Sequence, residues 1–106
     1  MVHKMRKITQ EAVKAFLEGQ DFHKDNTQIK CDKYNITMQL HGNPIAITII
    51  STREINISNA GWPTPTTKER LNGLLDALGV PGIYQKRGVW YWKGGEEFPN
   101  NQFVEV

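Results

Sequence analysis

The residues best suited to bind an anion lie where a proline-rich segment leads into a helix. A tryptophan, three threonine hydroxyls and two cations gather at this point: Trp62, Thr64, Thr66, Thr67, Lys68 and Arg70. The first turn of a helix has unpaired backbone N–H groups and a partial positive charge, which attract phosphate and carboxylate groups. Cations in a first turn oppose the helix dipole, so a sequence selected for stability alone would place acids there. These residues predict a contact with phosphate or a nucleic-acid backbone, with Trp62 as a stacking surface for a base.

The same residues also have a purely structural explanation. Thr66, followed three residues later by Glu69, has the pattern of a capping box. Thr64 is an alternative N-cap, with Pro65 at the first helical position. Lys68 and Arg70 would then be solvated. Because capping is so common at helix starts, we favour this explanation over phosphate binding.

A second candidate surface is a strand pair near residue 87, in which aromatic residues alternate with cations. Its members are Tyr84, Lys86, Arg87, Trp90, Trp92 and Lys93. This composition is typical of a platform for single-stranded nucleic acid or nucleotides. Alternatively the aromatic rings form core and the cations mark a solvated turn, and at least half of the rings must be buried in a chain of this size. Trp90 is the candidate for stacking, and Arg87 is expected to be accessible.

The sequence offers little for catalysis. His41 stands beside a Gly-Asn-Pro turn without a neighbouring nucleophile or carboxylate. Cys31 lies in an expected strand, where cysteine is usually a small buried hydrophobe. His3, His23 and His41 have no recognised metal-ligand spacing with it, and no phosphate-binding or dinucleotide fingerprint is present. We therefore expect a binding protein and not an enzyme, with no cofactor and no metal.

Two helices are expected to position these residues. Four leucines at helical spacing give the second helix a continuous apolar stripe: Leu71, Leu74, Leu75 and Leu78. Gly79 ends this helix. The first helix is expected to begin at Thr9 as N-cap and to end at Gly19, about ten residues later.

Between the helices the hydrophobic period changes to two, which predicts strands. The expected strands are 27–31, 34–40, 45–50 and 54–58, with 45–50 the most buried, and the hairpin strands are 83–86 and 89–92 around the Arg87-Gly88 turn. Residues 21–26 are expected to form a loop and 41–44 a turn, while 98–106 either add a short edge strand or trail over the surface. The prediction is an α+β fold in one domain, 1–106: an antiparallel sheet, built as a four-stranded meander plus the C-terminal hairpin, with two helices packed on one face.

Composition also bears on the cellular compartment and on membrane association. The chain has 106 residues, a net charge of +2 and a single cysteine, which favours a reducing cytoplasm. Its longest apolar run, residues 45–50, is too short to span a membrane, so no membrane association is expected. Either edge of the expected sheet could pair with a second copy, which leaves a homodimer open.

The segment Gly61–Asn72, together with 40–43 and 84–91, resembles small proteins of tailed bacteriophages. The resemblance covers about residues 22–92, and it implies a phage accessory protein that works in the bacterial cytoplasm. Small phage proteins of this kind often act by binding to a host enzyme, a defence complex, a signalling nucleotide or a nucleic acid. We therefore expect a non-enzymatic protein that binds and interferes with a host or anti-phage defence component. The alternative is a nucleic-acid or nucleotide-binding protein that uses the two surfaces above.

Overall fold

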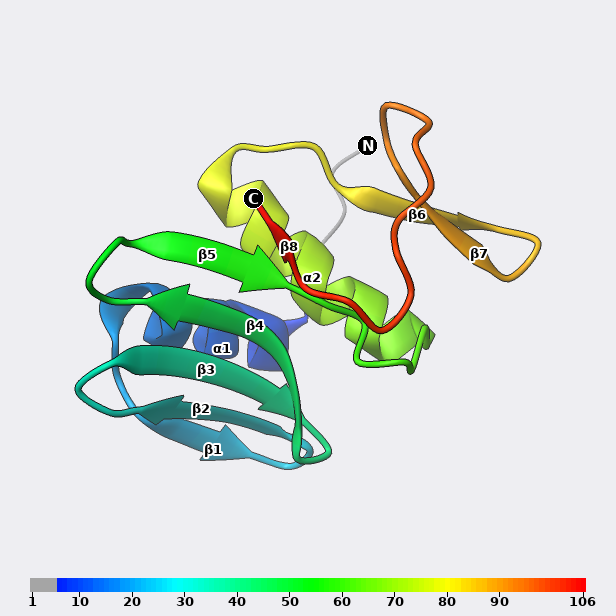
Figure 1. The fold of residues 1–106 in the computed structure, drawn as a ribbon. Coiled ribbons are helices and arrows are strands. Elements are labelled where there is room, and N and C mark those ends of the chain that lie inside the picture. The colour runs from blue at the N-terminus through cyan, green and yellow to red at the C-terminus, as the bar shows by residue number, and fades with distance from the viewer. Residues whose placement is uncertain (1–5) are drawn as a thin grey trace.

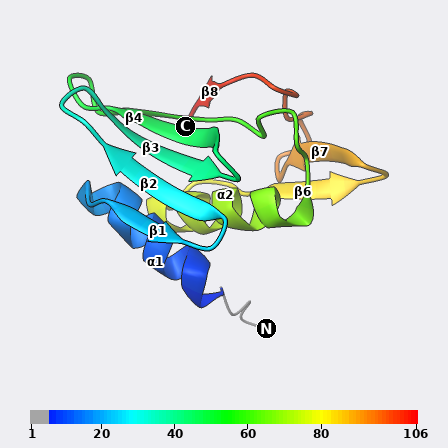
Figure 2. The same cartoon turned by 90° about the horizontal axis from the view of Figure 1, so that it is seen from below.

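The core lies between an antiparallel sheet and two helices that cover one of its faces (Figure 1). The computed structural model describes residues 6–106. Its elements are α1 (Lys7–Glu18), β1 (Phe22–Lys24), β2 (Thr27–Cys31), β3 (Asn35–Leu40), β4 (Asn43–Ile49), β5 (Glu54–Ile57), α2 (Pro65–Leu78), β6 (Ile83–Lys86), β7 (Val89–Trp92) and β8 (Val104–Glu105). Figure 2 shows α1 and α2 on the same side of the sheet. The predicted α+β class with two helices on one face is confirmed.

The sheet has six strands in the order β1-β2-β3-β4-β5-β8, and β6 and β7 form a separate pair. The meander therefore has five strands instead of the predicted four, because β1 forms within the expected loop 21–26. Phe22–Lys24 pairs with Thr27–Ile29 across a turn in which Asp25 has a φ of 52°. Aspartate tolerates this left-handed conformation. Phe22 is the only apolar residue of β1, so the strand has no hydrophobic alternation to reveal it.

Strand β4 begins earlier and is less buried than expected. The turn before it consists of His41 and Gly42 alone, with φ values of 51° and 80°. The register moves from Met38 opposite Ala46 to Gln39 opposite Pro44, which leaves Ile45 as an extra residue in a bulge. The bulge lets the consecutive residues Ile45 and Ala46 both enter the core. The rest of β4 is only half-buried, because the helices cover one face of the sheet.

Helix α1 begins three residues before the predicted start, so the prediction of Thr9 as N-cap is wrong. Arg6 is its N-cap residue and makes no side-chain capping bond, while Thr9 is fully buried inside the helix. Gly19 ends the helix with a φ of 69°, as predicted. The buried face of α1, which includes Ala12 and Phe16, packs against α2 and the sheet.

The β6–β7 hairpin turns at Arg87 and Gly88, with φ values of 54° and 80°, and this turn is confirmed. The C-terminal strand β8 pairs with β5, so the edge-strand alternative for the last residues is the observed one. No helix among residues 6–106 is long and apolar enough to cross a membrane.

Candidate binding surface

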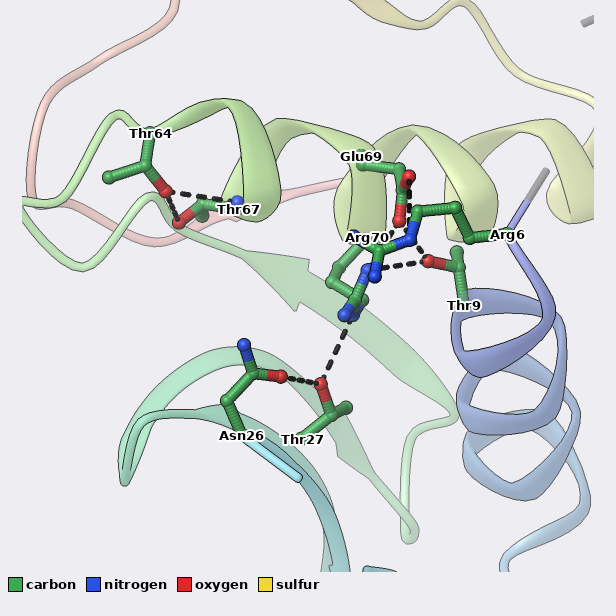
Figure 3. Close-up of polar contacts among 8 residues, drawn as sticks. All are labelled: Arg6, Thr9, Asn26, Thr27, Thr64, Thr67, Glu69 and Arg70. Atoms are coloured by element: carbon green, nitrogen blue, oxygen red, sulfur yellow. Dashed lines mark hydrogen bonds and ion pairs between the residues drawn. The ribbon is translucent and has the colours of Figure 1, made fainter. Parts of the chain in front are cut away.

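Helix α2 is capped by Thr64, the alternative that the sequence left open. Thr64 has an extended backbone, and its Oγ1 accepts a hydrogen bond from the Thr67 backbone N–H at 3.1 Å (Figure 3). Proline lacks an N–H and has a helical φ, so Pro65 makes the natural first residue after the cap. The capping box predicted for Thr66 and Glu69 is wrong. Thr67 is buried, and its hydroxyl lies 2.9 Å from that of Thr64.

The solvated position expected for Arg70 is also wrong. Only 1% of Arg70 is exposed, and its guanidinium lies among side chains of α1, β2 and α2 (Figure 3). Its Nη1 donates to Thr9 Oγ1 at 2.7 Å and pairs with Glu69, while its Nε donates to Thr27 Oγ1 at 3.1 Å. Burial lowers the pKa of Arg70, and the charge of Glu69 opposes that shift.

The two hydroxyls that accept from Arg70 also donate hydrogen bonds of their own, one on α1 and one on β2. Thr9 on α1 also donates to the Glu69 carboxylate, and Thr27 on β2 donates to Asn26 Oδ1 at 2.8 Å. Buried cations require such partners, because an unpaired charge in the core is costly. We call this set of residues, Thr9, Thr27, Glu69 and Arg70, the Arg70 network. It fixes α1, α2 and β2 relative to one another, and the Arg70 charge is no longer available to a ligand.

A sequence signal could have shown that Thr67 and Arg70 point inward. Thr67 precedes Leu71 by four residues, and Arg70 precedes Leu74 by four. Both positions therefore extend the leucine stripe of α2 backward by one turn. The polar character of the two residues hid this continuation.

Four residues of the first candidate surface line a groove of about 440 Å³: Trp62, Thr64, Thr66 and Thr67. Trp62, Thr64 and Thr66 form one side, and Leu40 and His41 at the β3–β4 turn form another. Trp62 is 61% exposed, so its ring is accessible beside the groove. Lys68 is half-buried on the first turns of α2.

The loop 59–64 that carries Trp62 is held by a buried asparagine, Asn59, which the sequence analysis did not single out. Asn59 Oδ1 accepts from the backbone N–H groups of Gly61 and Asn101, both at 2.8 Å. Its Nδ2 donates to Asn100 Oδ1 at 3.1 Å. Ala60 and Gly61 form a tight turn, and both have positive φ. Asn59 thereby joins this loop to the C-terminal segment.

The second candidate surface divides into a covered and an exposed face. Trp90 is 2% exposed and packs on Phe98, with ring centroids 5.6 Å apart, so it is not available for stacking at the surface. Lys86 and Arg87 are exposed at the turn. Tyr84 and Tyr91 stack on each other across the other face.

The hairpin is attached to α2 through Asn72. The Asn72 Nδ2 donates to the Ile83 carbonyl at 2.9 Å, and the Ile83 N–H donates to Asn72 Oδ1 at 2.7 Å. The side-chain amide thus takes the place of a neighbouring strand at the start of β6. Figures 1 and 2 both place the loop 59–64, the start of α2 and the hairpin at one end of the molecule. We call this the binding end.

The two side chains considered for catalysis lie apart from each other: Cys31 is half-buried in β2, and His41 lines the groove beside Trp62. Burial and the carboxylate of Asp21 both raise the pKa of the Cys31 thiol, which disfavours the reactive thiolate. His41 is exposed at its turn. Within residues 6–106, no group of three or more His, Cys, Asp or Glu side chains could hold a metal ion.

Comparison with known proteins gives one result, which covers nearly the whole chain. No curated protein and no solved structure matches the sequence. A model of one protein family, described as Kyanoviridae Gp96 protein, matches residues 5–105. This match supports the phage origin that the resemblance implied. The chain belongs to the Kyanoviridae Gp96 family of phage proteins.

Proposed function

We propose that this small phage protein is a non-enzymatic binder that interferes with a host or anti-phage defence protein through its binding end. The observation that carries the proposal is the exposure of Trp62, 61% of whose surface is accessible beside a groove. Tryptophan and arginine are enriched where interfaces gain most of their energy. Arg87 and Lys86 lie exposed at the same end of the molecule.

The nucleic-acid alternative has lost part of its support. Arg70, Thr67 and Trp90 are buried, which removes one cation, one hydroxyl and one stacking ring from the surface. The residues of the two candidate surfaces that stay at least partly accessible are Trp62, Thr64, Thr66, Lys68, Tyr84, Lys86, Arg87, Trp92 and Lys93. Phosphate tracking along a strand depends on several such cations, so protein binding is the better supported function.

The test uses Trp62→Ala with Tyr34→Ala as its matched control. Tyr34 is an aromatic residue, 66% exposed, in the β2–β3 turn at the end of the sheet away from the binding end. Each immobilised variant is incubated with lysate of the bacterial host, and captured proteins are quantified by mass spectrometry. We expect wild type and Tyr34→Ala to enrich the same protein, and Trp62→Ala to lose at least about tenfold of it.

Two outcomes would contradict the proposal. One is that wild type enriches no protein, and the other is that Trp62→Ala captures as much as Tyr34→Ala. Binding of DNA, RNA or cyclic nucleotides is measured in parallel at low and moderate salt. An affinity that falls steeply with salt and is lost in Lys68→Ala would favour the nucleic-acid alternative.

A further inference from the structure

The exposed face of the β6–β7 hairpin is defined by its register. Tyr84 pairs with Tyr91 and Lys86 with Val89, so these four side chains share one face. The opposite face carries Trp90, which is covered by Phe98. Tyr84 and Val89 are 38% and 37% exposed. We call the four residues Tyr84, Lys86, Val89 and Tyr91 the hairpin face.

The charge on and around this face is mainly positive. Between residues 83 and 93 the charged side chains are Lys86, Arg87 and Lys93, and no acid is present. Among the ion pairs of the described residues, none involves any of these three cations. The segment that runs along the outer edge of β7 carries two acids, Glu96 and Glu97. Glu97 forms a bridge with Tyr91, so its side chain lies on the side of the hairpin face, and the three cations outnumber it. A partner that complements this charge is acidic.

The tyrosine geometry favours protein carboxylates over nucleic acid. The rings of Tyr84 and Tyr91 are stacked, with centroids 5.5 Å apart and an interplanar angle of 23°. Each ring therefore has one face covered by the other, which leaves fewer open ring faces than two separate rings would offer to stacked bases. The phenolic hydroxyls remain as hydrogen-bond donors next to Lys86, and O–H and N–H donors of this kind together suit carboxylates.

We propose that the hairpin face docks on an acidic protein surface, with Lys86 and Arg87 opposite carboxylates and the stacked tyrosines at the centre of the contact. The inference rests on the proposed binding function and names the chemistry of the partner. Asn72 holds the start of β6 against α2, so the face is presented in a fixed position. Partly solvated charge pairs at such a contact make binding sensitive to salt.

The experiment uses a defined probe, so it does not depend on finding the natural partner. Isotope-labelled protein is titrated with a glutamate oligomer and, separately, with oligothymidylate of matched charge, while backbone amide shifts are followed by NMR. We expect the glutamate oligomer to shift amides of residues 84–91 and to bind more tightly than oligothymidylate. Tighter binding of oligothymidylate at the same amides would overturn the proposal in favour of nucleic acid.

Charge reversal supplies the matched control. The double variant Lys86→Glu with Arg87→Glu is compared with Lys30→Glu and Lys33→Glu, two exposed lysines in β2 and the β2–β3 turn. We expect about a tenfold loss of glutamate-oligomer affinity for the hairpin variant and less than about threefold for the control. Equal losses of affinity in the two variants would show that the oligomer responds only to the net charge of the protein, and would overturn the proposal. If Trp62→Ala abolishes capture from lysate while the hairpin variant retains both capture and oligomer affinity, the proposed function stands and this inference fails.

Discussion

The helical layer with its six-stranded sheet and the β6–β7 hairpin are stabilised in different ways, although both are tied to α2. On the sheet side, Arg70 reaches into the core and joins three elements through the hydroxyls of Thr9 and Thr27. On the hairpin side, Asn72 contacts the backbone of a single residue, Ile83. The sheet side thus has the large core and the buried charge. The hairpin contributes only Ile83 and Trp90 to the same core and depends otherwise on a few aromatic contacts. Regions with few buried contacts open locally more readily than the centre of the core.

This difference fits the proposal that the binding residues lie on segments attached to a more stable framework. Binding residues are often placed on loops and small attachments that a rigid framework positions. Trp62 and Arg87 belong to such segments, whereas Arg70, two residues from Asn72, belongs to the framework. Four substitutions test this contrast, from the largest expected effect to the smallest.

Arg70→Met should reduce the stability of the whole molecule. Removal of the guanidinium leaves the Thr9 and Thr27 hydroxyls without their cationic donor and Glu69 without its close cation. We expect the free energy of unfolding, measured by urea denaturation, to fall by about 4 kcal/mol. Lys68→Met on the same helix is the control, with an expected change below about 0.5 kcal/mol. A loss under about 1 kcal/mol for Arg70→Met would mean that the network does not stabilise the framework.

Phe98→Ala should act mainly on the hairpin. Its ring packs against both Trp90 and Trp92, at centroid distances of 5.6 and 5.0 Å. We expect the local stability of β6 and β7, measured by amide hydrogen exchange, to fall by about 3 kcal/mol, with a much smaller change at β3 and β4. Equal losses in both regions would remove the contrast, because the hairpin and the sheet would then unfold as one unit.

Asn72→Ala removes two hydrogen bonds between α2 and β6. The Ile83 N–H and carbonyl lose their partner, and we expect a local destabilisation of about 2 kcal/mol at the start of β6. The readout is faster exchange of the Ile83 amide. Asp76→Ala, an exposed position one turn further along α2, should leave that amide unchanged. Unaltered exchange in Asn72→Ala would show that the hairpin is held by its aromatic contacts alone.

Thr64→Ala tests the start of α2. Thr64 Oγ1 accepts from the Thr67 N–H, and loss of such a cap costs about 1 kcal/mol in unfolding free energy. Thr66→Ala, two residues away, should change the thermal midpoint little, because Thr66 is not the capping residue. The reverse order of effects would restore Thr66 as the N-cap.

Much of the framework could be predicted from hydrophobic periodicity. The leucine stripe and Gly79 define α2, and alternation defines β2, β3 and the hairpin, because these elements bury one face against an apolar layer. Strand β1 could not be predicted in this way, since backbone pairing across a turn forms it and its side chains contribute little core. The bulge at Ile45 likewise interrupts the alternation of buried and exposed residues by which a strand is predicted.

The candidate surface was harder to predict, because burial decides which polar residues can meet a ligand. Trp62 and Arg70 have the opposite exposures to those their residue types suggest. Arg70 can be buried only because Thr9, Thr27 and Glu69, from three separate parts of the sequence, converge on it. Such convergence is a property of the tertiary structure. The sequence indicates the burial of Arg70 only indirectly, because Arg70 stands four residues before Leu74 in the leucine stripe.

The contact between Asn72 and the segment before β6 also has an evolutionary consequence. A Cβ atom at Gly82 would lie 2.8 Å from Asn72 Oδ1, too close for the amide to keep its place. Any side chain at position 82 would therefore push the amide away from Ile83. Across the family we expect positions 72 and 82 to change together or not at all, so that relatives with a larger residue at 82 have also replaced the asparagine.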